Sequence, residues 1–452
     1  MTTTKRSRLK AGVALAAIIA QLAACAGTAR AFCGFYVAKA DSKLFNKSSK
    51  VVLARDGQET AITMASDYEG EPKEFAVVVP VPTFIRKDQI SVVDTKTIDH
   101  LDAYTAPRLV EYYDDDPCDT RKFLSSLQTA AMPDRALPTA PLPAAAYAGV
   151  KVEAQYDVAE YDISILSAEQ SDGLIRWLSD NGYKIPAGAE PVIGSYIKQK
   201  MHFLVSKVNV KRMQELGRTY LQPLQVRYET AKFMLPLRLG TVNANGPQDL
   251  IVYALTKEGR VETTNYRTIK VPSDVEVPLF VKDDFANFYK ATFDRAVAHE
   301  NMQGVFVEYA WDMAWCDPCA AEPMANDELK TLGAGWTGSG ASVANPSFSP
   351  SNGANGSNAF VTRLHVRYDA KTFPEDLNFV ETKDRENFQG RYILQYPSTA
   401  AATCPAGVQY RAALPARFQN EADTLIKLTG WSQSDIAARM AATGQPLAVR
   451  HD

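Results

Sequence analysis

The chain of 452 residues is 46% hydrophobic and 22% charged, a globular composition that excludes the disordered, collagen-like and coiled-coil classes. Its 49 Lys and Arg and 52 Asp and Glu residues give a net charge of −3. The first 31 residues hold five of the basic residues and no acidic one, so the remainder has a net charge of −8. A body this acidic lacks the electrostatic footprint of a nucleic-acid-binding protein, and no nucleic-acid partner is expected.

Residues 1–31 have the pattern of a secretory signal peptide. Basic residues between positions 5 and 10 precede an apolar run over 11–24, and Ala29-Arg30-Ala31 supplies the small residues of a cleavage site. We therefore expect an exported protein, periplasmic or secreted, that begins at Phe32. No later stretch reaches 18 consecutive apolar residues, so no transmembrane segment is expected in the mature chain.

The same N-terminal segment also permits an alternative in which the mature protein is lipid-anchored. Leu22-Ala23-Ala24-Cys25 is typical of a bacterial lipoprotein signal, in which Cys25 becomes the lipidated first residue. In this alternative a lipid at Cys25 anchors the protein to the cell envelope.

Residues 32–129 are predicted to be an N-terminal β-rich region. β-Branched segments indicate strands at 51–54, 60–64 and 75–81, and the last is apolar on both faces, as expected of an interior strand. A helix is expected near 97–113. Residues 130–149 follow as an Ala/Pro-rich connector, since 12 of these 20 residues are Ala or Pro.

Residues 150–332 are predicted to be a central α+β region. A helix is expected over 168–181, with Ser167 and Gln170 as a capping box and Gly182 at the C-terminal cap. A second helix is expected over 283–299. Strands are predicted at 150–156, 161–166, 201–208, 224–228, 233–239, 249–256 and 305–311.

The C-terminal part begins with a Gly/Ser/Asn-rich loop at 333–358, where 16 of 26 residues are of these three types and none is charged. Residues 359–452 then contain predicted strands at 359–368 and 392–396 and two short helices near 416–428 and 432–440. Together these elements predict an α+β fold in which sheets, antiparallel or mixed, dominate and a few amphipathic helices pack on them.

Five cysteines lie beyond the signal and are candidates for structural disulfides, because an exported protein meets an oxidising compartment. They are Cys33, Cys118, Cys316, Cys319 and Cys404. An odd number leaves one thiol spare, and the spacing does not determine the pairing.

The segment Trp315-Cys316-Asp317-Pro318-Cys319 looks like the redox site of thioredoxin-like proteins, in which one thiolate attacks and the other resolves the mixed disulfide. However, Asp317 disfavours a thiolate beside it, and the glycine-rich tract occupies the place of the helix that such a fold needs. We therefore expect Cys316 and Cys319 to form a structural bridge, with a catalytic pair as the alternative.

Other catalytic residues are not identified by motifs. The five histidines are scattered without zinc-ligand spacing, and nucleophile-elbow, phosphate-loop and dinucleotide motifs are absent, so no metal and no cofactor is expected. A hydrolase that uses two carboxylates stays open, since such a pair needs no local motif.

Several segments in order resemble the bacterial secreted-protein family of domain of unknown function 2330, over most of residues 33–400. These are Cys33-Gly34-Phe35-Tyr36, Phe75 to Pro82, Trp177-Leu178 with Asn181-Gly182-Tyr183, Cys316-Asp317-Pro318-Cys319, and Val361-Thr362-Arg363-Leu364-His365 with Arg367-Tyr368. The resemblance implies an exported bacterial protein and assigns no activity, fold or ligand. We expect a non-catalytic binding or envelope-structural protein whose partner is unknown; the alternatives are a thiol-disulfide oxidoreductase or a carboxylate-based hydrolase.

Overall fold

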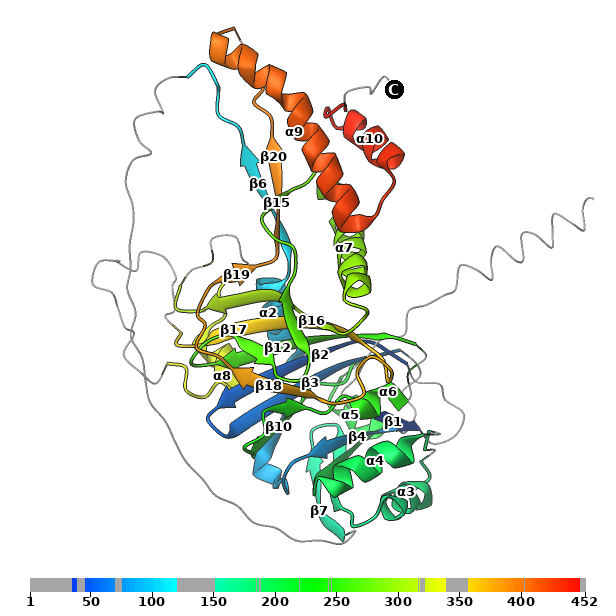
Figure 1. Cartoon of the computed structure of the whole chain (residues 1–452). Helices are drawn as coiled ribbons and strands as arrows, with labels where there is room; N and C mark the ends of the chain where they lie inside the picture. The colour runs from blue at the N-terminus through cyan, green and yellow to red at the C-terminus, as the bar shows by residue number, and fades with distance from the viewer. Residues whose placement is uncertain are drawn as a thin grey trace, which may run out of the picture.

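Figure 1 shows the computed structural model of the chain. The structure describes residues 35–38, 45–69, 75–119, 151–183, 185–186, 188–218, 220–242, 244, 246–315, 317, 322–338, 357–401 and 403–447. The predicted signal peptide, the Ala/Pro-rich connector and Cys25, Cys33, Cys316 and Cys319 lie outside these residues. Helices and sheets in the described part confirm the α+β class.

The elements follow the chain in a mixed order of strands and helices. The strands are β1 (Phe35–Ala38), β2 (Phe45–Asp56), β3 (Glu59–Glu69), β4 (Phe75–Val81), β5 (Ile90–Val92), β6 (Arg108–Tyr113), β7 (Lys151–Val158), β8 (Tyr161–Ser167), β9 (His202–Val208), β10 (Leu224–Glu229), β11 (Met234–Leu235), β12 (Gln248–Thr256), β13 (Val261–Thr263), β14 (Arg267–Lys270), β15 (Val275–Glu276), β16 (Gly304–Asp312), β17 (Phe360–Tyr368), β18 (Leu377–Glu381), β19 (Phe388–Gln389) and β20 (Arg391–Tyr396). The helices are η2 (Lys87–Gln89), α2 (Thr95–Thr105), α3 (Ser171–Asp180), α4 (Ala189–Lys198), α5 (Val210–Glu215), α6 (Arg238–Val242), η4 (Leu279–Asp284), α7 (Phe285–His299), α8 (Asn326–Thr331), α9 (Pro405–Thr429) and α10 (Gln433–Ala442).

A nine-stranded mixed sheet forms the centre of the molecule. Its strand order is β14-β16-β17-β12-β2-β3-β10-β5, and β19 pairs with β16 outside this path. The β2–β12 and β14–β16 pairs are parallel, and the other pairs are antiparallel. The sheet therefore combines strands from the N-terminal, central and C-terminal regions of the chain.

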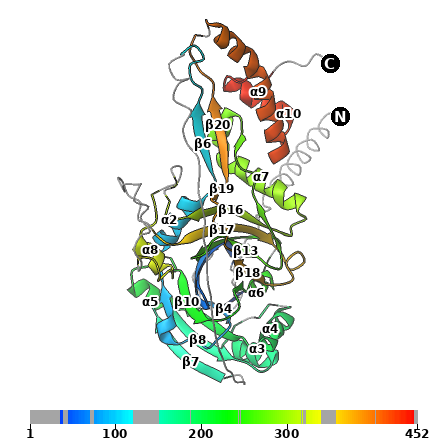
Figure 2. The ribbon, with the colours of Figure 1, turned by 60° about the vertical axis from the view of Figure 1, so that its left-hand side comes forward.

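The main core lies between this sheet and an antiparallel five-stranded sheet of order β1-β4-β9-β8-β7 (Figure 2). On β4, Val77, Val79 and Val81 face this core, whereas Ala76 and Val78 face a second core beneath α3 and α4. Both faces of β4 are thus buried, which is the reason for its continuous apolar run. The interior position predicted for this strand is confirmed, since β4 lies between β1 and β9.

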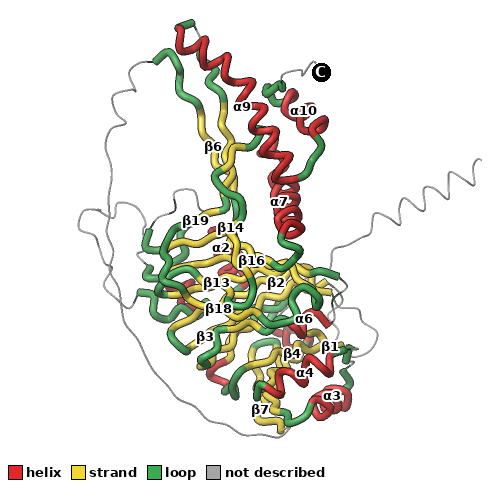
Figure 3. Tube along the Cα trace, viewed as in Figure 1, coloured by secondary structure: helices red, strands yellow, loops and turns green. Residues whose placement is uncertain are grey.

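An arm extends from one edge of the central sheet, as Figures 1 and 3 show, and carries the C-terminal helices. It contains the three-stranded sheet β15-β20-β6 and an apolar cluster shared by η4, α7, β20, α9 and α10. A disulfide joins Cys118, which follows β6, to Cys404 at the N-cap of α9. This bridge closes a loop of sequence separation 286, so it removes much conformational freedom from the unfolded chain.

The helix expected near 97–113 is wrong in its second half. Asp94 caps α2 by accepting from the backbone N–H of Lys96 at 3.0 Å, and the helix ends at Thr105. Ala106 precedes Pro107 and has an extended ψ of 145°, because the proline ring disfavours helical geometry in the residue before it. Residues Arg108–Tyr113 form strand β6 instead.

The helix expected over 168–181 is present as α3 with a different N-terminus. Gln170 is its N-cap without a side-chain cap hydrogen bond, and Ser167 is the last residue of β8, so the predicted capping box is wrong. The C-terminal cap is confirmed. Gly182 has φ +82°, and the N–H of Tyr183 donates to the carbonyl of Leu178 at 2.9 Å.

Two further predictions needed correction. Residues 233–239 contain the two-residue strand β11 and the start of α6 rather than one strand. Helix α9 begins at Pro405, well before the predicted 416, because Pro405 lies at a first-turn position that needs no N–H donor and Pro415 is accommodated inside the helix.

Replacing Leu178 with Ala tests the packing of α3. Leu178 is fully buried in the core between α3, α4 and the five-stranded sheet. We expect Leu178→Ala to reduce the free energy of unfolding by about 2–5 kcal/mol, since the lost contacts leave a cavity. Urea unfolding measures this change. The exposed neighbour Ser179 is the matched control, and Ser179→Ala should cost less than about 0.5 kcal/mol. Equal losses in both variants would contradict the assigned packing.

Candidate functional site

Of the five candidate cysteines, Cys33 lies outside the described residues, and the other four form two groups. Cys118 and Cys404 form the disulfide of the arm. Cys316 and Cys319 lie outside the described residues, so neither their predicted bridge nor the alternative redox role is described. Asp317 lies between these two cysteines in the sequence. Its carboxylate is buried and accepts from the hydroxyl of Tyr309 at 2.9 Å and from the amide of Gln389 at 2.7 Å.

One histidine, which the sequence left unassigned, lies in a buried charge network on the central sheet. Glu308 of β16 is 1% exposed and faces Arg363 and His365 of the neighbouring strand β17. Its Oε2 accepts from Arg363 Nε at 2.5 Å, and its Oε1 lies 2.7 Å from His365 Nδ1. The hydroxyl of Tyr289 on α7 also donates to Glu308, and the ring of Phe293 stacks on His365. Glu308 therefore links the sheet to α7.

The charges of these neighbours keep Glu308 ionised. Burial alone would raise the pKa of Glu308, but the attraction of His365 and Arg363 outweighs burial and lowers this pKa to about 2. A carboxylate that is ionised at neutral pH cannot donate a proton there, so Glu308 is not suited to act as a general acid.

The network continues to helix α2. Arg363 also donates to Asp102 at 2.5 Å, and Asp102 accepts from the hydroxyl of Tyr253 at 2.7 Å and pairs with Lys50 at 2.7 Å. Burial opposes ionisation of Asp102, but Arg363 and Lys50 lower its pKa. The charges of the buried Arg363 and of the half-buried Asp102 and Lys50 thus compensate one another, and they hold α2 against the sheet.

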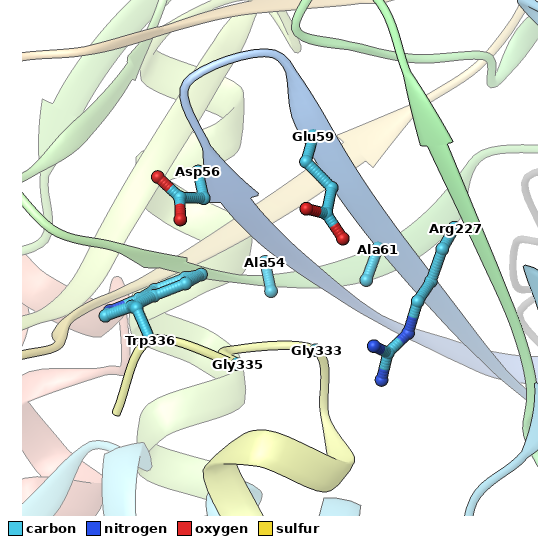
Figure 4. A pocket seen from close by; sticks show the side chains of 8 residues that line it. All are labelled: Ala54, Asp56, Glu59, Ala61, Arg227, Gly333, Gly335 and Trp336. Carbon is cyan, nitrogen blue, oxygen red and sulfur yellow. The ribbon is translucent and has the colours of Figure 1, made fainter. Parts of the chain in front are cut away.

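A pocket of about 230 Å³ lies on the same side of the sheet as α2 and α8. It is formed by the ends of strands β2 and β3, by β10, and by the loop that follows α8 (Figure 4). Its lining residues are Ala54, Asp56, Glu59, Ala61, Arg227, Gly333, Gly335 and Trp336. Figure 4 shows Trp336 and Arg227 at opposite ends of the pocket, with Glu59 between them.

The loop after α8 approaches the sheet closely at Gly333. This glycine has φ +107°, a backbone conformation that other residues rarely adopt, and a Cβ atom here would lie 2.4 Å from Cβ of Ala61 and 3.1 Å from Cβ of Ala54. Only glycine facing two alanines allows this approach. The first residues of the predicted Gly/Ser/Asn-rich loop therefore pack on the sheet, and Ala334 is fully buried.

The side chains at the two ends of the pocket are held by polar contacts. Gln225 accepts from Arg227 Nε at 3.1 Å, and Gln225 itself donates to Thr63 and to the carbonyl of Thr331. The indole N–H of Trp336 donates to the carbonyl of Asn358 at 3.3 Å. Both side chains are thereby positioned before any ligand binds.

The charges of the pocket are only partly compensated. Asp56 pairs with Lys257 at 2.7 Å, and the Lys257 ammonium also lies 5.4 Å from the centre of the Trp336 ring. By contrast, Glu59 has no ion pair or hydrogen bond with any described side chain, and Arg227 has no carboxylate partner within the described part of the chain. One negative and one positive charge in the pocket are therefore available to a ligand.

The sequence did not single out these pocket residues. Leu224, Val226 and Tyr228 alternate with polar residues on β10, a period-two pattern that places Arg227 on the face opposite the main core. This pattern could have marked Arg227, but nothing local connects it to Glu59 and Trp336, which come from distant segments.

Comparison with known proteins identifies the chain at the level of a family. Residues 27–380 match a family of uncharacterized proteins conserved in bacteria, defined by domain of unknown function 2330. The chain belongs to this family. All pocket residues lie within the part of the chain that matches the DUF2330 family, whereas α9 and α10 lie beyond it. No curated protein and no solved structure matches the chain.

Two features of the described residues bear on metal binding and on membrane insertion. Among these residues, no group of three or more His, Cys, Asp or Glu side chains is arranged to hold a metal ion. Likewise, none of the helices in the described ranges has both the length and the apolar character of a membrane span.

Substituting Glu308 tests the charge network. Glu308→Gln leaves Arg363 and His365 without their shared carboxylate, so we expect a loss of about 3–5 kcal/mol in the free energy of unfolding at pH 7. Because the pKa of Glu308 is lowered on folding, its contribution is fully present above its unfolded value of 4.5 and is lost as the pH falls towards 2. The difference in the free energy of unfolding between Glu308→Gln and wild type should therefore become smaller below pH 4.5.

Denaturant unfolding at several pH values between 3 and 8 measures this dependence. Asp327→Asn is the control, since Asp327 forms an exposed pair with Lys330 and should contribute less than about 1 kcal/mol. If the difference in the free energy of unfolding between Glu308→Gln and wild type stays constant over this pH range, the ionised Glu308 carboxylate does not stabilise the fold as proposed.

Proposed function

We propose that the chain is an exported bacterial binding protein without catalytic activity, and that the pocket beside Trp336 is its ligand site. The observation that carries this proposal is the convergence of an aromatic ring, a carboxylate and a guanidinium on one cavity. Small-molecule sites typically combine a few convergent polar groups with an apolar wall. The charges of Glu59 and Arg227, which lack ionic partners among the described residues, are the groups that a ligand would compensate.

A carboxylate-based hydrolase receives less support from the same geometry. Such an enzyme needs two carboxylates that act on one bond, one as acid and one as base or nucleophile. Asp56, the second carboxylate of the pocket, is instead engaged by Lys257. Glu308 is enclosed by its partners in the sheet.

The export part of the proposal rests on the basic and apolar pattern of residues 1–31. The Cys118–Cys404 disulfide supports it, because such bonds persist in oxidising compartments and are rare in the cytosol. Lipid anchoring at Cys25 is the alternative form of the same proposal.

Expression of the full chain in a bacterial host tests export. We expect the mature protein in the periplasmic or secreted fraction with Phe32 as its first residue, determined by N-terminal sequencing and intact mass. Cys25→Ala should leave this product unchanged. A cytoplasmic product that retains Met1 would refute export, and an acylated Cys25 would replace cleavage before Phe32 with the lipoprotein alternative.

Ligand binding is tested by thermal unfolding with four classes of small probe: amino acids, monosaccharides, dicarboxylates and nucleoside monophosphates. A ligand that binds only the folded state stabilises it by about 2.7 kcal/mol at 100 times its Kd. We expect one class to raise the Tm of the wild type and not that of Arg227→Gln. Arg267→Gln is the matched control, because Arg267 is an exposed arginine on β14 outside the pocket.

Recovery of the probe unchanged, checked by mass spectrometry, supports the absence of catalysis. If no class raises the Tm, the binding function fails and the envelope-structural role replaces it. If a probe is consumed and Glu59→Gln abolishes its consumption, the hydrolase alternative replaces it.

A further inference from the structure

The pocket carries information about ligand chemistry as well as about ligand binding. We infer that it takes an α-amino acid with an apolar side chain, bound as a zwitterion, with its carboxylate at Arg227, its ammonium at Glu59 and its side chain against Trp336. This inference rests on the proposed binding function and names the class of ligand for the same site.

The two charges are placed for separate groups of one ligand. Arg227 on β10 is paired across the sheet with Ala61 on β3, so Glu59 is its diagonal neighbour, two residues along β3. Diagonal neighbours in antiparallel sheets are about 7–8 Å apart in their backbones. The Glu59 carboxylate and the Arg227 guanidinium do not form an ion pair with each other, although both line the pocket. A ligand that carries a carboxylate and an ammonium on one carbon atom, as an α-amino acid does, can satisfy both.

The guanidinium is oriented to receive a carboxylate. Its Nε donates to Gln225, which leaves the two terminal nitrogens without a partner among the described residues. Arginine binds carboxylates through paired N–H groups, and a fixed guanidinium loses less freedom when it does so. Gln225 is buried and is itself held by Thr63, so this orientation is maintained without ligand.

The negative charge favours an ammonium rather than a second anion. Of the two carboxylates in the pocket, Asp56 is compensated by Lys257, and Glu59 is left with its charge. A dicarboxylate would bring its second anion beside Glu59, and a neutral sugar would form no ion pair with either the exposed Glu59 or the half-buried Arg227. An ammonium beside Glu59 is charge-matched and strongly hydrogen-bonded.

The size and the walls of the pocket complete the inference. Its volume of about 230 Å³ lies below the ~300–1,000 Å³ of pockets for drug-sized ligands, which favours a small metabolite. The floor consists of Ala54 and Ala61, and Gly333 and Gly335 add no side chain. Trp336 at the end away from Arg227 is then the main apolar surface for a ligand side chain.

The experiment compares four related probes by isothermal titration calorimetry with the full chain. L-Leucine has all three groups, N-acetyl-L-leucine lacks the cation, L-leucinamide lacks the carboxylate, and glycine lacks the side chain. We expect L-leucine to bind wild type at least about tenfold more tightly than each of the other three. This is about 1.4 kcal/mol or more for each missing group.

Two variants assign each group to its partner. In Glu59→Gln the preference for L-leucine over N-acetyl-L-leucine should narrow, whereas its preference over L-leucinamide should remain. In Arg227→Gln the preference for L-leucine over L-leucinamide should narrow, whereas its preference over N-acetyl-L-leucine should remain. Arg267→Gln should keep all preferences of the wild type, and circular dichroism establishes that each variant is folded.

The outcomes separate this inference from the proposed function. If monosaccharides, dicarboxylates or nucleotides bind in a way that depends on Arg227 and L-leucine does not, the zwitterion inference is wrong and the binding function stands. Equal affinity for L-leucine and both blocked forms would also overturn the inference. If no probe of any class binds, the pocket is not a small-molecule site and both proposals fail.

Discussion

The nine-stranded sheet buries side chains on both of its faces, because the five-stranded sheet covers one face and α2 and α8 cover the other. Val51 and Leu53 of β2 point to the first core, whereas Val52 and Ala54 point to the second. Burial of apolar area is the main favourable term in the free energy of folding. Because this sheet is covered on both faces, successive residues of a strand such as β2 all contribute to that term. The covering elements must then reach the sheet from distant parts of the chain.

Double burial also determines where charges can lie within the sheet. The face that receives α2 and α7 contains Arg363, His365 and Arg367 at alternate positions of β17, and each must be compensated there. Arg367 pairs with Asp249 at 2.7 Å and with Asp294 of α7 at 2.5 Å. These ion pairs connect α2 and α7 to particular strands. Breaking a buried pair costs more than the pair contributes, so the network favours one arrangement of the covering helices.

The sequence predicted local features best where a single segment decides the structure. The both-faced apolar run of β4 identified an interior strand, and Gly182 identified the end of α3. Sequence-based prediction failed where a single residue overrides the pattern of a longer segment. The helix expected near 97–113 ends at Thr105, because Pro107 disfavours helical geometry in the residue before it. Likewise, Ser167 is needed by β8 and is not available to cap α3.

The candidate site was less predictable, since its residues come from separate segments. Alternation on β17 contains enough information to place Arg363, His365 and Arg367 on one face of a strand. It does not identify Glu308 as the partner of Arg363 and His365, because that pairing depends on the register between β16 and β17. The same holds for Glu59 and Arg227, whose proximity follows from the pairing of β3 with β10.

The position of the pocket follows from the same constraint as the core. At the ends of β2 and β3, Asp56 is half-buried and Glu59 is exposed. The loop after α8 reaches the buried Ala54 and Ala61 beside them only because Gly333 has no side chain. Deeper in the sheet, charges such as Glu308 must be matched by protein groups, because water and ligands do not reach them. At the edge, solvent stabilises a charge that the protein leaves unmatched. The ends of these strands are thus where the fold can leave Glu59 and Arg227 without ionic partners and available to a ligand. Charges in the interior instead form the ion pairs that hold the helices on the sheet.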